Sequence, residues 1–331
     1  MPTGRPPLVP LRALGAARGV TVGAAVNGRP LGADATYREV LAREFGAVTC
    51  TNAMKFGPLQ PERGRFDFAP ADEIVAFGRD HGMAVRGHTL VWHRQNPEWI
   101  AALAERETAA LWPALRAHIQ AVMEHYRGQV AAWDVVNEAV ADDGSPRDTL
   151  WLRALGAGYV AHAFRWAHEA DPGAPLFYND YGADGLGPKA DAVHALLCDL
   201  LDQGVPVHGV GLQMHVGLGR LTPDPDAVAA HMRRLGALGL EVHVTEMDVR
   251  LQTGSGPLAE RPAEQARVYE RTLAACLSER ACTSVTFWGF TDRHSWIPSF
   301  TGQDDAPLLF DPQYQPKPAY HAVARALSSQ V

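Results

Sequence analysis

Two glutamates stand out because each closes a short apolar run and has other polar residues beside it. Glu138 follows the run WDVVN at residues 133–137, and Glu246 lies within VHVTEMD at residues 242–248. Two carboxyl groups that face one substrate can divide acid–base work, one donating a proton while the other attacks or activates water. In glycosidic bond cleavage their separation selects the outcome, about 5–5.5 Å for retention and about 6.5–9.5 Å for inversion. The sequence supplies such a pair but not its separation.

Polar residues also occur where the other apolar runs end. Any single one would ordinarily be a strand cap or a hydrogen-bonded core residue. Their recurrence at the ends of seven successive runs instead indicates one shared site. In chain order they are Asn52, Lys55, His88, Trp92, Gln95, Asn137, Glu138, Asn179, Asp180, Gln213, His215, Glu246, Asp248 and Trp288.

The elements that must position these residues alternate between strands and helices. Strands are predicted at residues 21–26, 45–51, 84–92, 131–138, 175–181, 209–215, 241–249 and 284–290. Most are nearly continuous apolar runs, as expected for parallel strands buried on both faces. Between them lie amphipathic segments such as residues 111–126, and one that begins at Asp224 as N-cap with Pro225 in the first turn. Eight such units predict an α/β fold, a closed (β/α)8 TIM barrel with the two glutamates at the C-terminal ends of strands four and seven, where barrel active sites form.

The composition narrows the class of partner. Of the 331 residues, 47% are hydrophobic and 20% are charged, which supports a large buried core. The formal net charge of −7 argues against a nucleic acid or an anionic membrane as partner. No apolar stretch has the length of a membrane span. We therefore expect residues 1–331 to form one monomeric barrel domain with neither a nucleic-acid nor a membrane partner.

The N-terminal segment bears on cellular location. Pro2, Pro6, Pro7 and Pro10 interrupt it, so it lacks the continuous apolar core of a signal peptide. The protein is then either cytoplasmic, with Met1 as its native start, or extracellular, with this chain as a mature form. We expect the extracellular form.

Long motifs occur in order along almost the whole chain. They read RGHTLVWH at residues 86–93, WDVVNEA at 133–139, VTEMD at 244–248, WGFTD at 288–292 followed by Ser295 and Trp296, PLLFD at 307–311 and PKPAY at 316–320. Together they resemble the third-strand, acid/base, nucleophile, eighth-strand and C-terminal motifs of glycoside hydrolase family 10, the endo-β-1,4-xylanase family. Such a set is far more specific than one short motif. The resemblance implies a retaining endo-β-1,4-xylanase that cleaves xylan through a covalent glycosyl-enzyme, without a cofactor or metal.

The resemblance also implies a role for each site residue. Glu246 would attack the anomeric carbon, while Glu138 would protonate the leaving oxygen and later activate water. His215 and Asp248 would orient Glu246, and Asn137 would bind the 2-hydroxyl of the reacting sugar. The remaining residues would bind substrate: Lys55, His88 and Gln213 at the reacting sugar or its neighbour, Asn52 and Gln95 at the next sugar, and Trp92, Trp288 and Trp296 as walls and platforms.

Two features need separate comment. Cys276 and Cys282 are close enough on the chain to form a disulfide or to remain free thiols, and the resemblance favours the disulfide. The second-strand signature, usually Glu-Asn-x-Met-Lys in the family, reads TNAMK at residues 51–55. The family glutamate contacts a hydroxyl of the sugar one site beyond the cleavage position. Thr51 is shorter and uncharged, so this contact is in doubt.

Three alternatives fit parts of the sequence. A metal-dependent barrel enzyme could use Glu138, Asp180 and Glu246 as ligands. Lys55 and the tryptophans suit a sugar better than a metal ion. Activity that survives a chelator would exclude this metal-dependent alternative. A non-catalytic carbohydrate-binding barrel would be expected to lack one of the two glutamates. A third alternative keeps the retaining chemistry on another β-glycoside, with a non-sugar aglycone or with transfer to another sugar.

Overall fold

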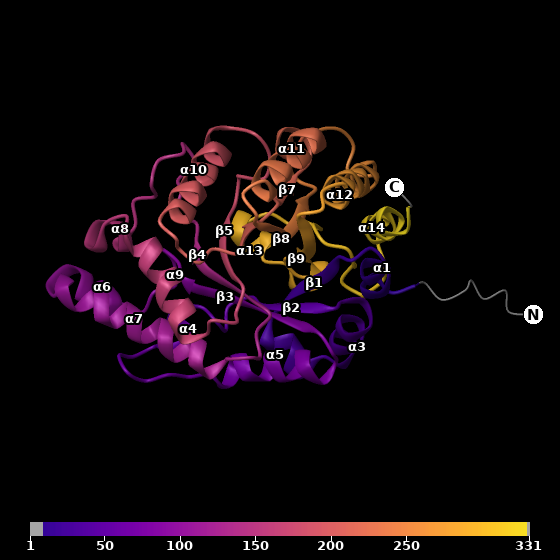
Figure 1. Ribbon diagram of the computed structural model, residues 1–331. Helices are drawn as coiled ribbons and strands as arrows, with labels where there is room; N and C mark the ends of the chain where they lie inside the picture. Colours follow the sequence, from indigo (N-terminus) through magenta and orange to yellow (C-terminus); the bar gives the residue numbers. More distant parts are fainter. Residues whose placement is uncertain (1–8, 330–331) are drawn as a thin grey trace, which may run out of the picture.

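The computed structural model describes residues 9–329 as a ring of parallel strands surrounded by helices (Figure 1). Its strands and α-helices in chain order are α1 (Leu11–Ala17), β1 (Thr21–Val26), α2 (Gly28–Ala33), α3 (Ala35–Glu44), β2 (Ala47–Cys50), α4 (Phe56–Leu59), α5 (Ala69–Asp80), β3 (Ala84–Val91), α6 (Glu98–Arg106), α7 (Thr108–His125), β4 (Ala132–Asn137), α8 (Leu150–Leu155), α9 (Tyr159–Ala170), β5 (Leu176–Asp180), α10 (Pro188–Asp202), β6 (Gly209–Leu212), β7 (His215–Gly217), α11 (Pro225–Gly236), β8 (Glu241–Arg250), α12 (Arg261–Leu277), β9 (Cys282–Phe287), α13 (Ile297–Thr301) and α14 (Pro318–Ser328). Pro2, Pro6 and Pro7, on which the location argument partly rests, lie outside the described residues. Across residues 9–329, no helix has the length and apolar character needed to cross a membrane.

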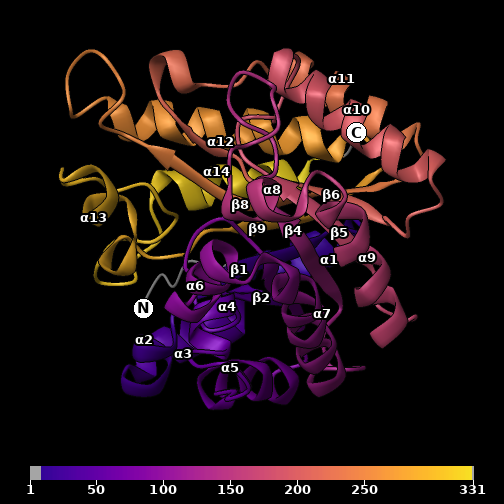
Figure 2. The same ribbon diagram turned by 90° about the vertical axis from the view of Figure 1, so that its left-hand side faces the viewer.

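Eight strands close the ring by parallel pairing. Their order is β1-β2-β3-β4-β5-β6-β8-β9, and β1 pairs with β9, so that Thr21 lies opposite Ser284. Helices α3, α5, α7, α9, α10, α11 and α12 lie in the connections between these strands, and α14 follows the last one. Figure 2 shows α11 and α12 on the opposite side of the strands from α3 and α5. The predicted (β/α)8 barrel is confirmed.

The burial of the elements follows from the apolar pattern of the sequence. Every position of β4 and of β5 is buried, because helices cover the outside of the ring while neighbouring strands fill its inside. The start of α11 is as expected: the Asp224 side chain accepts a hydrogen bond from the backbone N–H of Asp226, and Pro225 opens the helix. Val228 and Met232 then form part of its buried stripe.

The sixth strand differs from the expectation. One strand was predicted over residues 209–215, but the chain forms β6 and then the separate strand β7. Between them Met214 has φ of 61°, a left-handed conformation through which an extended strand cannot continue. β7 pairs with the far end of β8, which places His215 opposite Asp248. The last strand also ends earlier than predicted, at Phe287, so Trp288 lies in the loop after it.

Candidate active site

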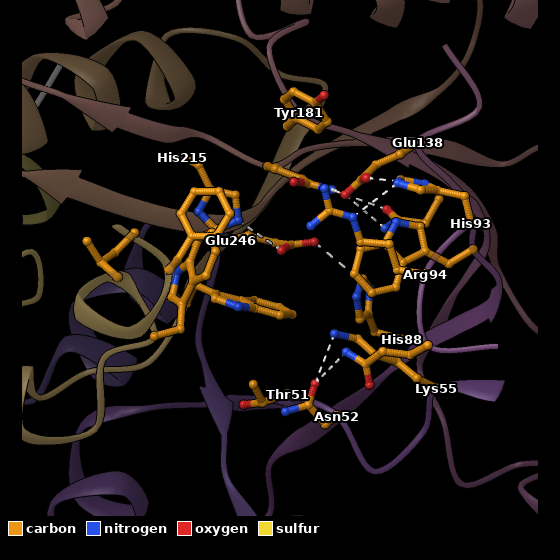
Figure 3. A pocket seen from close by; sticks show the side chains of 18 of the residues that line it. Thr51, Asn52, Lys55, His88, His93, Arg94, Glu138, Tyr181, His215 and Glu246 are labelled. Atoms are coloured by element: carbon orange, nitrogen blue, oxygen red, sulfur yellow. Dashed lines mark hydrogen bonds and ion pairs between the residues drawn. The ribbon is translucent and has the colours of Figure 1, made fainter. Parts of the chain in front are cut away.

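A cleft of about 500 Å³ opens at the ends of the strands. Every side chain to which the family resemblance assigns a role lines this cleft except Asp248, which is completely buried. Glu138 and Glu246 both point into the cleft, and Asn52 and Lys55 lie together at another side of it (Figure 3). The fold thus brings together polar residues that are widely separated in the sequence.

Glu138 directly follows β4 and has φ of 59°, in the left-handed region. Its Oε1 accepts hydrogen bonds from Gln213 Nε2 at 3.0 Å and from Asn137 Nδ2 at 3.3 Å. Its Oε2 faces His93 Nδ1 at 3.6 Å, beyond hydrogen-bond range. Two amides therefore fix one carboxyl oxygen, while the other has no hydrogen bond within residues 9–329.

Glu246 lies in β8, and both of its carboxyl oxygens are held. Oε1 accepts a hydrogen bond from Asn179 Nδ2 at 2.8 Å, and Oε2 accepts one from His215 Nε2 at 3.1 Å. Burial acts to raise the pKa of Glu246, but His88 and His215 outweigh it and bring that pKa below its usual value. The group is therefore ionised near neutral pH.

His215 bridges two carboxylates. Its Nδ1 donates to Asp248 Oδ2 at 2.9 Å, while its Nε2 donates to Glu246. Burial acts to lower the pKa of His215, but Asp248 and Glu246 together outweigh burial and raise it to about 10. Trp296 Nε1 donates to the same Asp248 oxygen at 2.9 Å. Asp248 therefore holds both the histidine beside Glu246 and a tryptophan of the cleft wall.

Buried amides connect the two glutamates. Asn179 Nδ2 donates to Asn137 Oδ1 at 2.9 Å as well as to Glu246, and Asn137 in turn donates to Glu138. Thr245 Oγ1 donates to Asn179 Oδ1 at 2.7 Å, which fixes the orientation of that amide. Only two amide side chains thus separate one carboxylate from the other.

Asp134 lies under the cleft and is 1% exposed. It accepts hydrogen bonds from Arg86 Nε at 3.0 Å and from His88 Nδ1 at 2.9 Å. Because this bond occupies Nδ1 of His88, its Nε2 remains available to a ligand. His88 also meets the ring of Trp288 edge to face, with the ring centroids 5.2 Å apart.

A second polar group lies after β2 and β3. Asn52 Oδ1 accepts hydrogen bonds from Lys55 Nζ at 3.1 Å and from Gln95 Nε2 at 3.1 Å. Lys55 Nζ also lies 4.5 Å from the centroid of the Trp92 ring. Burial lowers the pKa of Lys55 despite the nearby glutamates. Thr51 lines the cleft beside this group.

Several cleft residues were missed by the sequence analysis, namely His93, Arg94, Arg147, Tyr181, Arg250, Ile297 and Phe300. His93 and Arg94 directly follow Trp92, so their position after a strand end was an available signal. Arg147 lies in the long connection after β4, where no periodic pattern marks it. Its Nε donates to the backbone oxygen of Glu138 at 2.8 Å.

Residues 10–326 match the sequence model of glycosyl hydrolase family 10. The chain belongs to this family. The relationship predicted from the motifs is therefore confirmed, and the protein is a glycoside hydrolase.

Three relatives of this family 10 chain are similar to it over nearly their whole length. Endo-1,4-beta-xylanase B of Thermotoga neapolitana is 38% identical, covering 98% of this chain and 93% of that protein. Endo-1,4-beta-xylanase B of Paenibacillus barcinonensis is 41% identical, covering 90% and 93%. The structure of xylanase 10B from Thermotoga petrophila RKU-1 in complex with xylobiose is 40% identical and covers 98% of each chain with a TM-score of 0.91.

Two further sequence questions concern metal ligands and cysteines. Within residues 9–329, no cluster of three or more His, Cys, Asp or Glu side chains could hold a metal ion. Asp180, a ligand in the metal-dependent alternative, instead bonds to Tyr178 and pairs with Lys189. A disulfide joins Cys276 in α12 to Cys282 at the start of β9.

Proposed function

We propose that this protein is a retaining endo-β-1,4-xylanase with Glu246 as nucleophile and Glu138 as acid/base. The observation that carries the proposal is the contrast between the two carboxylates. Glu246 is kept ionised by His88 and His215 and has both oxygens held in place, whereas Glu138 has one oxygen fixed and one free. The xylanase activity named for its relatives, and the xylobiose bound by one of them, support xylan as the substrate.

In the first step an oxygen of Glu246 attacks the anomeric carbon as the bond to the leaving oxygen breaks. Glu138 transfers its proton from Oε2 to that oxygen, so the leaving sugar departs as a neutral alcohol. In the second step Glu138, now a carboxylate, takes a proton from water. The water oxygen attacks the same carbon, the bond to Glu246 breaks, and the configuration is retained.

The other cleft residues bind the substrate. Asn137 would bind the 2-hydroxyl of the reacting sugar, where hydrogen bonds strengthen in the transition state. Lys55, His88 and Gln213 would contact the same sugar or its neighbour. Asn52 and Gln95 would bind the next sugar. Trp92, Trp288 and Trp296 would form the aromatic walls and platforms of the cleft.

Replacing each of the two glutamates by alanine should affect the activity of the enzyme differently. Glu246→Ala should abolish turnover of every glycoside, because no covalent intermediate can form. Glu138→Ala should retain activity on aryl glycosides whose leaving groups need no protonation, and azide should increase that activity by replacing the activated water. Equal losses of the two variants on an activated aryl xylobioside would contradict the assignment.

Two product measurements complete the test. The enzyme should release xylo-oligosaccharides from linear xylan, and it should give no comparable release of products from cellulose. NMR of the first products should show the β-anomer, and an initial α-anomer would exclude retention.

A further inference from the structure

Asp180 is a buried carboxylate that the proposed mechanism leaves without a task. It ends β5, next to the strand that carries Glu138, and it is 1% exposed. Lys189 on α10 pairs with its Oδ1 at 3.0 Å and is itself 5% exposed. Burying such a pair is costly in desolvation, and ion pairs of this kind often contribute little net stability. A contribution to stability alone therefore does not explain why Asp180 and Lys189 are buried as a pair.

The second oxygen of Asp180 faces the turn that follows Glu138. Oδ2 accepts a hydrogen bond from Tyr178 Oη at 2.5 Å and a longer one from the backbone N–H of Val140 at 3.4 Å. The same Tyr178 Oη accepts a hydrogen bond from the backbone N–H of Ala139 at 3.0 Å. The two residues directly after Glu138 are thus tied to Asp180, one directly and one through Tyr178.

The backbone conformation of Glu138 requires hydrogen bonds that hold it in place. A non-glycine residue with φ of 59° is in a sparsely populated conformation that persists only where its surroundings hold it. The peptide before it is fixed by its own N–H, which donates to the Asn179 oxygen at 2.8 Å. The peptide after it is fixed by Arg147 at its oxygen and by Tyr178 at its nitrogen.

We infer that Asp180, fixed by Lys189 and acting through Tyr178, is a positioning residue that aims the carboxyl group of Glu138 at the leaving oxygen. The inference rests on the proposed role of Glu138 as acid/base. Asp180 itself touches no reacting atom. Its negative charge orients the Tyr178 hydroxyl, whose proton points at Asp180 and whose lone pair therefore faces Ala139. Without that charge the turn is free to shift, and a displacement of about 1 Å at a catalytic group can cost as much as a hundredfold in rate.

This role predicts a loss that grows with the need for a proton. Asp180→Asn should lower kcat/KM about tenfold on phenyl xylobioside, whose leaving group must be protonated. On dinitrophenyl xylobioside the leaving group departs unaided, and the loss should be about threefold or less. A purely structural role would reduce kcat/KM by the same factor across the series, because fewer molecules would be active. The ratio kcat/KM is the quantity to compare, because it includes no step after the glycosyl-enzyme has formed.

The chain offers a matched control in a second buried Asp–Lys pair. Asp292 pairs with Lys317 at 2.8 Å, and both side chains are largely buried. Asp292→Asn makes the same chemical change, and none of the hydrogen bonds within residues 9–329 joins Asp292 to Glu138 or to the two residues after it. It should reduce kcat/KM equally on every aryl group. A loss graded with the leaving group in this variant would overturn the inference.

Two further variants keep the outcomes distinct. Glu138→Gln should show the graded loss in its strongest form, and a uniform loss there would overturn both the proposed acid/base and its positioning. A graded loss in Glu138→Gln with a uniform loss in Asp180→Asn would overturn the positioning role alone. If Asp180→Asn does not fold, Tyr178→Phe removes the intermediate hydroxyl while keeping the ring. Tyr178→Phe should give the same graded loss as Asp180→Asn, and a uniform loss in Tyr178→Phe would reject the inference.

Discussion

Replacement of Asp248 by asparagine tests how the nucleophile is held. Asp248 Oδ2 accepts hydrogen bonds from His215 Nδ1 and from Trp296 Nε1, each at 2.9 Å. Its Oδ1 is buried and has no hydrogen-bond partner among residues 9–329. Asparagine fits this space with its oxygen at the Oδ2 position, so both hydrogen bonds can remain while the charge is lost. The variant therefore removes the charge and keeps both hydrogen bonds.

The expected loss follows from the type of hydrogen bond. A hydrogen bond to a charged group is worth about 1.5–3 kcal/mol, so weakening the one to His215 should lower kcat about ten- to a hundredfold. The asparagine amide would also occupy the unpartnered Oδ1 position, where an unsatisfied donor costs about 1–3 kcal/mol of folding stability. The melting temperature should therefore fall together with kcat.

The pH dependence gives a second signature. His215 has its pKa raised from 6.5 to about 10, so the stabilisation of the folded state by its charge is complete below about 6.5 and is lost as the pH rises through about 10. Removing the Asp248 charge lowers this pKa, so the alkaline limb of stability should move to lower pH. An unchanged kcat with an unchanged alkaline limb would refute the reasoning.

Trp296→Phe is the matched control for the other hydrogen bond. It removes the donor to Asp248 Oδ2 but leaves the carboxylate and His215 in place. The alkaline limb of stability should then stay where it is in the unaltered enzyme. A shift equal to that of Asp248→Asn would show that the tryptophan contact, and not the charge on Asp248, controls the histidine.

Two further outcomes are expected. Reduction of the disulfide between Cys276 and Cys282 should lower the free energy of unfolding by only about 2 kcal/mol, because the loop that the disulfide closes is short. The melting temperature should therefore fall by only a few degrees. Titration of four free thiols in the oxidised protein would contradict the pairing. Thr51→Glu should raise kcat/KM about tenfold on aryl xylobioside but not on aryl xyloside, because the added carboxylate would reach only the second sugar. No gain, together with a strong preference of the unaltered enzyme for xylobioside, would count against this reading of Thr51.

The barrel and most of the cleft could be predicted because they depend on local patterns. Apolar runs separated by amphipathic segments identify strands and helices, and the βα loops of a barrel meet at one end whatever their sequence. Residues such as His88 and Gln213 could therefore be assigned to one site. The break between β6 and β7 could not be predicted, because Met214 is fixed by Asp184, whose Oδ1 accepts the Met214 N–H at 3.0 Å. That contact joins residues thirty positions apart.

The environment of Asp180 was also beyond sequence analysis. A carboxylate at a strand end looks the same whether it will bind a metal, a sugar or a lysine. Lys189 lies on the following helix, and only the packing of α10 against the barrel places its ammonium group over the Tyr181 ring and next to Asp180. The partner of a buried charge is decided by tertiary packing and has no signature in the spacing.

The pairing of the first strand with the last has a consequence for synthesis on the ribosome. β1 emerges early, but its neighbour β9 follows only after almost the whole chain has been translated. Until then β1 and, once it has been made, β8 present open edges, to which strands of another nascent chain can add. The ring closes when β9 inserts between them and forms two ladders at once. Because Asn52 follows β2 and Trp288 follows β9, a nascent chain that has not reached β9 has no complete cleft, and substrate cannot assist its folding.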